Sequence, residues 1–367
     1  MKISFQQSFF TLAFFTLFFV VLIFAKSVLI PISFALLLSF ILFPLHKKLI
    51  SWGWGNILAA LSSILALIII IAGVLTFFSA EILSLSDQLT DFGDKLTKLF
   101  SDVLVFANEN LPFLGNLDKD ELMEDGKTWL KDSAGGLLGS TFSNTTSFFT
   151  GLFTAFIYTF LFLIYRKGLV KAFLHFPAKE EEGTFYQMLR KIQLVGQKYL
   201  SGMITLILIL GFANSIGLWI IGIDSPFLFG FLAATLSIIP YIGTTLGATI
   251  PVLYALMSKD ELWVPIAVAI MFWIIQVIES NFLSPKIVGK SVNVNAFAAI
   301  LSLIIGASVW GVAGMILFLP FSAMFKVICE HYDQLKPLSL LIGESTYKEG
   351  EEKDSKSIWK SLKEKVS

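Results

Sequence analysis

Long uncharged stretches separated by short groups of charged side chains are the dominant pattern along this chain. A helix needs about 20 mostly apolar residues to cross a hydrocarbon layer about 30 Å thick. Eight gaps in the sequence reach or approach that length. They run from Lys2 to Lys26, Lys26 to His46, Lys48 to Glu81, Asp132 to Arg166, Lys198 to Asp224, Asp224 to Lys259, Glu261 to Glu279 and Lys290 to Lys326. The pattern predicts about eight transmembrane helices.

The spans are expected to be helical, because an unpaired backbone amide is costly in hydrocarbon and the alternation of barrel strands is absent. The predicted fold class is therefore all-α, a polytopic integral membrane protein. The gaps Asp224–Lys259 and Lys290–Lys326 hold 34 and 35 uncharged residues. Each is longer than one untilted crossing. We expect one or both to be broken or re-entrant.

Composition supports this class. Of 367 residues, 56% are apolar and 15% charged, whereas soluble chains have about 45–50% apolar and about 25% charged residues. The net charge is zero, so nothing in it indicates a nucleic-acid partner. The single cysteine, Cys329, excludes an internal disulfide and a cysteine-cluster metal site, and its apolar neighbours indicate inert packing.

The distribution of basic residues predicts the orientation. The segment from Glu81 to Asp132 has 5 Lys and 12 acids, whereas Arg166 to Lys198 has 7 basic residues and 3 acids. Basic residues are retained on the cytoplasmic side, so the second segment and both termini are expected on the cytoplasmic side of the membrane. The predicted divisions are N-terminal spans at 1–80, an extracytoplasmic segment at 81–145, a span at 146–165, a cytoplasmic amphipathic segment at 166–200, C-terminal spans at 201–330 and a tail at 331–367.

Two segments outside the predicted spans have amphipathic helical spacing. One follows Glu81, and the other includes Phe185, Met188 and Tyr199. They are interpreted either as elements that gate the membrane domain or as solvated helices that cover its loops.

A search for catalytic or metal-binding motifs predicts neither an enzyme nor a cofactor or metal site. His46, His175 and His331 lack the spacing of a zinc site. The run that ends Gly289-Lys290-Ser291 has Ser284 where a phosphate-binding loop needs glycine, and no nucleophile elbow is found.

The segment from Ile238 to Pro251 is unusual at membrane depth. It holds prolines, glycines and hydroxyl side chains: Pro240, Tyr241, Gly243, Thr244, Thr245, Gly247 and Pro251. Prolines and glycines weaken helix continuity, and transporters use broken helices to bind substrates or ions. The alternative is a kinked helix that packs closely through small residues.

A second polar group ends the next apolar run and comprises Gln276, Glu279, Asn281, Pro285 and Lys286. An acid in the membrane interior is costly and indicates function, with Lys286 or Lys290 as partner. The alternative places Glu279, hydrated, at the interface. In the eighth gap, helix packing is the expected role of Gly306, Gly311, Gly314 and Pro320.

Taken in order, these motifs resemble a known family. Pro240 to Gly243 through Pro251, the run 279–290, and Gly311 to Gly314 with Pro320 are similar to the C-terminal signature of the autoinducer-2 exporter (AI-2E) family of bacterial permeases. Pro31 to Pro44 is similar to its second span. The resemblance implies an inner-membrane homo-oligomer with about eight spans and helices broken near 240–251 and 279–290.

The resemblance also implies transport. Members are connected with export of the quorum-sensing signal autoinducer-2 or with sodium–proton antiport. For antiport, Glu279 is the candidate protonatable group; for a polyol-like solute, Tyr241, Thr244, Thr245, Gln276 and Asn281 could donate or accept hydrogen bonds. The alternative function is a structural or regulatory membrane component that docks partner proteins and transports nothing.

Overall fold

The structure, a computed structural model, describes residues 5–89, 148–239, 242–259, 261–289 and 293–343. These residues form helices, and their only β-pairing is an isolated bridge between Val294 and Gly343. Six helical stretches of the described residues are long and apolar enough to cross a membrane, and shorter apolar helices accompany them. The prediction of an all-α polytopic membrane protein is confirmed. The acidic part of the predicted segment 81–145 and the tail after 343 lie outside the described residues.

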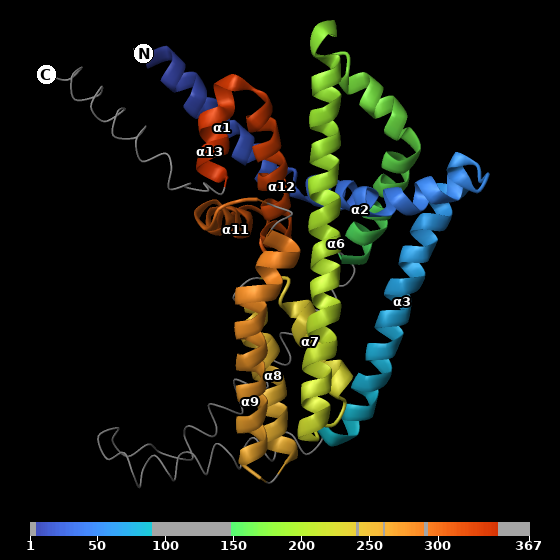
Figure 1. The fold of residues 1–367 in the computed structure, drawn as a ribbon, viewed down its shortest axis with the longest axis vertical. Coiled ribbons are helices and arrows are strands. Elements are labelled where there is room, and N and C mark those ends of the chain that lie inside the picture. The colour runs from blue at the N-terminus through green and yellow to red at the C-terminus, as the bar shows by residue number, and fades with distance from the viewer. Residues whose placement is uncertain (1–4, 90–147, 240–241, 260, 290–292, 344–367) are drawn as a thin grey trace, which may run out of the picture.

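The N-terminal part contains α1 (Phe5–Phe24), α2 (Lys26–Ser51) and α3 (Asn56–Leu89). With the helix Phe148–Phe173, α2 and α3 build a small core through Leu42, Ala60 and Leu163. In Figure 1, α2 lies across the long axis of the molecule, whereas α3 runs along it. These helices bring the ends of three chain segments, near residues 46, 56 and 166, close to one another.

The longest helix, α6 (Glu182–Ile221), is unbroken over 40 residues, about 60 Å. The short η2 (Lys179–Glu181) precedes it. The predicted amphipathic segment therefore continues into the next span as one helix. No proline occurs between 182 and 221, and the buried Phe185, Met188 and Tyr199 extend the inner face of the span. The helix ends at Gly222, whose φ of 87° suits glycine.

The sixth predicted span is two short helices, α7 (Pro226–Leu236) and α8 (Ile242–Ser258). Pro226 lies at the first position of α7, where its missing N–H costs nothing. Asp224 before α7 and Lys259 after α8 form an ion pair of 3.3 Å, so the first and last residues of the hairpin lie next to each other. This gap is therefore broken and re-entrant.

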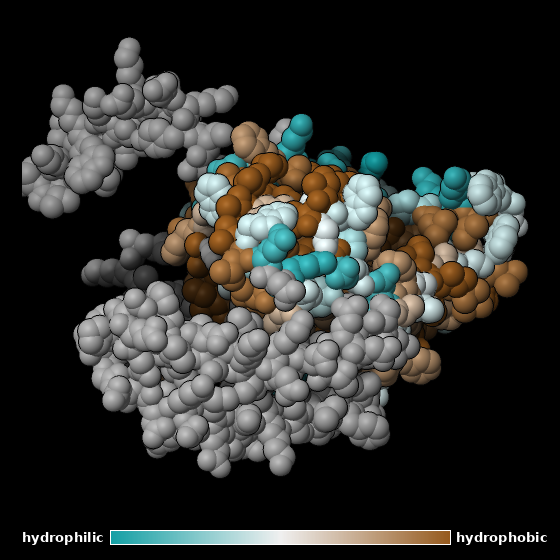
Figure 2. Space-filling view, turned by 90° about the horizontal axis from the view of Figure 1, so that it is seen from below, coloured by the Kyte–Doolittle hydropathy of each residue, from teal (hydrophilic) through white to brown (hydrophobic). Residues whose placement is uncertain are grey.

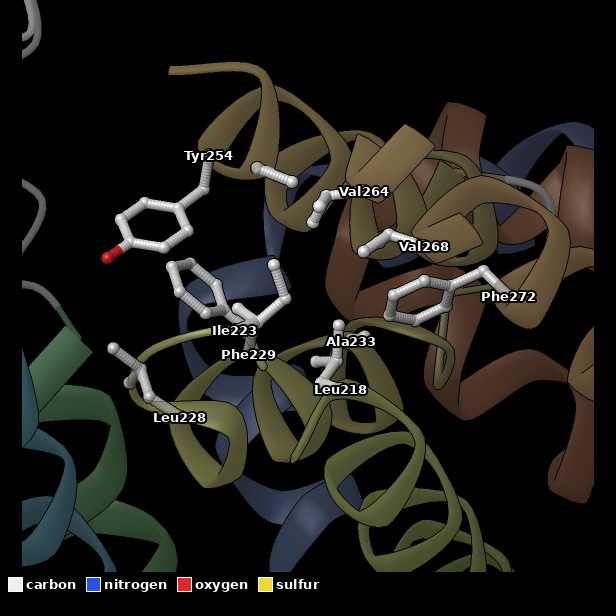
Figure 3. Close-up of a cluster of buried hydrophobic side chains, with 10 residues drawn as sticks. Leu218, Ile223, Leu228, Phe229, Ala233, Tyr254, Val264, Val268 and Phe272 are labelled. Atoms are coloured by element: carbon white, nitrogen blue, oxygen red, sulfur yellow. The ribbon is translucent and has the colours of Figure 1, made fainter. Parts of the chain in front are cut away.

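The hairpin packs tightly against its neighbours. Phe229 of α7 and Tyr254 of α8 have ring centroids 4.7 Å apart, and both belong to a buried cluster with α6 and α9 (Figure 3). A Cβ on Gly230 would lie 2.3 Å from Oγ of Ser215 on α6. Small side chains thus allow the hairpin backbone to approach α6 closely.

The next helix, α9 (Trp263–Ile278), continues as π-helical turns, η3 (Glu279–Leu283) and η4 (Pro285–Gly289). Pro285 has no N–H and its ring clashes with the carbonyl four residues earlier, so the regular hydrogen-bond pattern cannot pass through it. Widened π turns of this kind are frequent at functional sites. The expected interruption of 279–290 is present as a change of helix type.

The eighth gap is also broken. α11 (Ala296–Trp310) and α12 (Val312–His331) meet at Gly311, whose φ is 60°. A Cβ on Gly314 would lie 1.9 Å from the Gly306 carbonyl oxygen, so the two helices touch at these glycines. The packing role expected of Gly306 and Gly314 fits this contact, and Pro320 is buried inside α12. After η5 (Asp333–Leu335), α13 (Lys336–Ile342) returns to α11, where Nδ2 of Asn295 donates to the carbonyl oxygens of Leu341 and of Gly343, the residue after α13.

The outer surface is strongly hydrophobic, as expected for contact with lipid. Along α9, Ile266, Ile270 and Trp273 are more than half exposed, while Val268 between them is fully buried. Seen from below, hydrophobic side chains lie above and beside a small central group of hydrophilic side chains (Figure 2). Exposed apolar faces of this extent are typical of membrane proteins.

Candidate functional site

A small polar cavity lies where α6, the α7–α8 hairpin and the end of α9 meet. Its volume is about 20 Å³, roughly the space of one water molecule. It is lined by Leu210, Asn214, Ala233, Ala234, Ser237, Thr244, Gly247, Ala248, Phe272, Ile275, Gln276 and Glu279. Five of these side chains are polar: four come from α6, α8, α9 and the turn after α9, and Ser237 comes from the connection between α7 and α8. We call this group the polar cavity.

Glu279 is the acidic member of the polar cavity, and its residue is 9% exposed. It continues the inward face of α9 after Val268 and Phe272, opposite the exposed Trp273 and Val277. It lies about 24 Å along the helix from Trp263, within the span Trp263–Gly289. The structure thus places its carboxyl group among protein side chains, on a helix long and apolar enough to cross a membrane.

Glu279 forms no ion pair with another described residue. Lys286, one expected partner, is exposed on η4, and Lys290, the other, lies outside the described residues. The side chain of Gln276, one turn earlier, lines the cavity beside the Glu279 carboxyl group. A buried carboxyl group with a neutral neighbour can exchange a proton or coordinate a cation, because no fixed positive charge competes for it.

Asn214 enters the cavity from α6 and was not among the residues predicted from sequence. It is 4% exposed, and its Oδ1 has no hydrogen-bond partner among the described residues. Leaving such an acceptor unpaired costs about 1–3 kcal/mol, which a bound water, cation or solute hydroxyl group would recover. The only sequence signal was an isolated amide within an apolar run.

The hairpin contributes both hydroxyl groups and close packing. Ser237 donates to the Ala234 carbonyl oxygen at 2.7 Å, which leaves its oxygen available as an acceptor. A Cβ on Gly247 would lie 2.9 Å from Cα of Ala233, and one on Gly243 would overlap the Leu236 carbonyl group. The two glycines therefore serve the close-packing alternative, whereas Thr244 lines the cavity.

The remaining predicted residues lie elsewhere. Thr245 is exposed, and Pro251 is buried inside α8. Asn281, exposed on η3, donates to the Val277 carbonyl oxygen at 2.8 Å. Like Pro285 and Lys286, it does not line the cavity. Pro240 and Tyr241 lie outside the described residues.

The described residues include no group of three or more His, Cys, Asp and Glu side chains able to hold a metal ion. What they assemble is a buried acid with amides and hydroxyl groups between broken helices. Discontinuous helices around a polar site within the membrane are the architecture of secondary transporters. Fold and site together define the class of polytopic membrane transport proteins.

The chain belongs to the AI-2E family of transporters, whose family model it matches over residues 12–334. It is 24% identical to the "AI-2 transport protein TqsA" of Escherichia coli (strain K12), over 88% of this chain and 91% of TqsA. It is 23% identical to "Putative transport protein YhhT" of the same strain, over 87% of this chain and 89% of YhhT.

A more similar but shorter match is to "Putative transport protein YrrI" of Bacillus subtilis (strain 168), 34% identical over 138 residues. This match covers 38% of each chain. The matched regions of the first relatives thus span about two-fifths of their length, whereas those of TqsA and YhhT span most of it. The resemblance inferred from the sequence motifs is confirmed.

Proposed function

We propose that this protein is a secondary transporter that exports a small polar solute, with the polar cavity as its ion-coupling site. The observation that carries the proposal is the burial of Glu279 beside Gln276 and the unpaired Oδ1 of Asn214. An ion-coupled carrier needs a carboxyl group that can release and rebind a cation during its cycle. Such a group is costly to bury without a use.

The volume of the cavity limits what it can hold in this conformation. About 20 Å³ accommodates a water molecule or a bare cation but not a polyol. The proposed state is therefore occluded, with room for H⁺ or Na⁺ alone. A solute would enter when the α7–α8 hairpin moves away from α6, because Ser237, Thr244 and Asn214 would then separate.

The name of TqsA supports AI-2 as a candidate solute. The proposed location is the bacterial inner membrane, with the basic segment Arg166–Lys198 and both termini in the cytoplasm. A homo-oligomer within the lipid bilayer remains a prediction.

The coupling proposal is tested by flux into proteoliposomes under imposed proton or sodium gradients. Glu279→Gln keeps the size and hydrogen bonding of the side chain but removes its exchangeable charge. We expect flux to lose its dependence on the gradient. The matched control is Glu261→Gln, an exposed acid before α9, which should keep wild-type coupling. Unchanged gradient dependence in Glu279→Gln would exclude Glu279 from the mechanism.

A second comparison tests the cavity itself. Asn214→Leu removes the unpaired acceptor, whereas Asn281→Leu changes an exposed amide whose Nδ2 donates to the Val277 carbonyl oxygen and to Oγ of Ser280. We expect flux to fall at least tenfold in Asn214→Leu and little in Asn281→Leu. Equal losses of flux in the two variants would show that transport does not depend specifically on the polar cavity. If wild-type protein moves no solute or cation at all, the structural or regulatory alternative replaces this proposal.

A further inference from the structure

A larger cavity, separate from the polar cavity, lies near the other end of α6. It has a volume of about 950 Å³ and is bounded by α2, the helix Phe148–Phe173 and the first half of α6. It is lined by Phe43, Pro44, His46, Lys47, Ile50, Asn56, Leu163, Ile164, Arg166, Lys167, Val170, Tyr186, Leu189, Arg190, Gln193, Leu194 and Gln197. We call it the basic groove.

The charged residues that line the basic groove are all cationic. They are Lys47, Arg166, Lys167 and Arg190, and none of the described lining residues is Asp or Glu. The chain as a whole has equal numbers of acids and bases, so this separation of charge is local. Four cations facing one space repel one another, and an anion there would relieve the repulsion.

Two side chains of the groove are held in place. Arg166 donates through Nη2 to Oε1 of Gln193 at 2.7 Å, and its guanidinium carbon lies 3.9 Å from the ring centroid of Phe43. These contacts occupy one edge and one face of the guanidinium group. Its other N–H groups can bind an oxyanion, and a pre-oriented arginine loses little entropy on binding.

His46 is an independent sign of a missing ligand. It is 3% exposed, and its Nε2 lies 3.3 Å from the Asn56 carbonyl oxygen. Its Nδ1 is buried and has no partner among the described residues. Buried polar atoms are seldom left unpaired, so a polar group of a bound ligand would satisfy this nitrogen.

The surroundings of the groove place it at a membrane interface. Trp52 and Trp54, in the turn after α2, are 63% and 44% exposed, and Lys48 lies 5.2 Å from the Trp52 ring centroid. Exposed tryptophans and lysines mark the depth of lipid headgroups. The exposed apolar side chains of Ile50 and Leu194 also line the groove, so it offers contacts for acyl chains as well as for an anion.

We infer that the basic groove binds the phosphate group of an anionic phospholipid. Basic pockets between membrane helices bind such headgroups, and here Arg166 and Arg190 would contact the phosphate while the apolar wall contacts the chains. A soluble phosphate compound shares the anionic chemistry but would gain nothing from that wall. The site is distinct from the polar cavity and does not depend on the proposed transport cycle.

The test uses the purified full chain with phosphatidylglycerol and phosphatidylcholine of identical acyl chains, and native mass spectrometry counts retained lipids. We expect preferential retention of phosphatidylglycerol. Arg190→Gln should weaken it about fivefold, and Arg166→Gln combined with Arg190→Gln about 25-fold, because each basic residue contributes roughly one such factor near a headgroup. Lys47→Gln with Lys167→Gln is a second pair that leaves the Arg166 contacts intact.

The matched control is Lys171→Gln with Lys198→Gln, which removes two exposed charges outside the groove and should leave retention unchanged. Equal loss in the control would overturn the inference, because attraction would then be nonspecific. Equal retention of both lipids by the wild type would also overturn it. Displacement of phosphatidylglycerol by millimolar inorganic phosphate would assign the site to a soluble anion and overturn the lipid assignment.

Discussion

Asp224 and Lys259 form an ion pair of 3.3 Å at the open end of the α7–α8 hairpin. Both side chains are partly exposed, so the pair contributes at most about 1 kcal/mol to stability. Its importance is positional. The two residues bound the longest uncharged run before α9. Their contact shows that the two ends of this run lie next to each other, so the chain turns back within it.

The first prediction concerns that topology. In a Cys329→Ser background, Asp224→Cys and Lys259→Cys should both react with a membrane-impermeant maleimide from the same side, and the double variant should form a disulfide. Cys329 is fully buried, so its replacement removes little background. Lys171→Cys, an exposed position eleven residues before the start of α6, should react only from the other side. Labelling of positions 224 and 259 from opposite sides would contradict the re-entrant hairpin.

The second prediction concerns the contact between the hairpin and α6. Gly230→Ala adds a Cβ that would meet the backbone N and Cα of Ser215 at 2.5 and 2.8 Å. Backbone cannot move aside cheaply, so we expect destabilisation of about 1–3 kcal/mol, measured as a lower unfolding temperature in detergent. Gly151→Ala is the matched control, because a Cβ there meets nothing within 4 Å. That control should be neutral or slightly stabilising.

The third prediction concerns the α11–α12 hairpin. Gly314→Ala would place a methyl group against the Gly306 carbonyl group, and the two helices would have to separate. We expect a loss of stability similar to that of Gly230→Ala, together with faster proteolysis near Gly311. Gly73→Ala, with open space around its Cβ position, should not change the proteolysis pattern. Wild-type behaviour of Gly314→Ala would show that this close contact is absent.

The fourth prediction concerns Asn295. Its Oδ1 accepts from the Ala298 N–H at 2.8 Å as the N-cap of α11, and its Nδ2 donates to the Leu341 and Gly343 carbonyl oxygens at 2.7 and 2.9 Å. Asn295→Ala should destabilise the protein by about 1–2 kcal/mol, measured by chemical unfolding. Asn295→Asp keeps the cap and loses the donor, so an intermediate effect is expected. A neutral Asn295→Ala would contradict the role assigned to the cap.

The sequence predicted the helical spans well because charge placement is a strong constraint in a membrane. It could not decide whether the run between Asp224 and Lys259 crosses or returns, since its length allows one tilted helix or two short ones. The ion pair between its ends and the ring contact between Phe229 and Tyr254 show that it returns. Likewise, the change from charged to uncharged residues near Lys198 indicated a boundary between a cytoplasmic segment and a span. The backbone of α6, however, is helical on both sides of Lys198 and continues without a break.

Residues of the polar cavity were predicted correctly where polar side chains stand out in an apolar sequence. The prediction failed where the direction of a side chain on its helix decides whether it lines the cavity. Thr244, Gln276 and Glu279 were predicted and line the polar cavity. Asn281 was predicted from the same run but lies exposed on η3, because helical rotation turns it away from Glu279. Asn214 was missed, since a lone amide in a long apolar helix gives no sign of which face is buried.

The unbroken course of α6 makes it a lever. Gln193, beside the basic groove, and Asn214, in the polar cavity, are about 30 Å apart on one stiff rod. A tilt of about 5° around the midpoint between these two residues would shift each of them by about 1.3 Å in opposite directions. A displacement of α6 beside the basic groove would therefore change the space around Asn214 in the polar cavity. No connected series of side-chain contacts between the two sites would be needed.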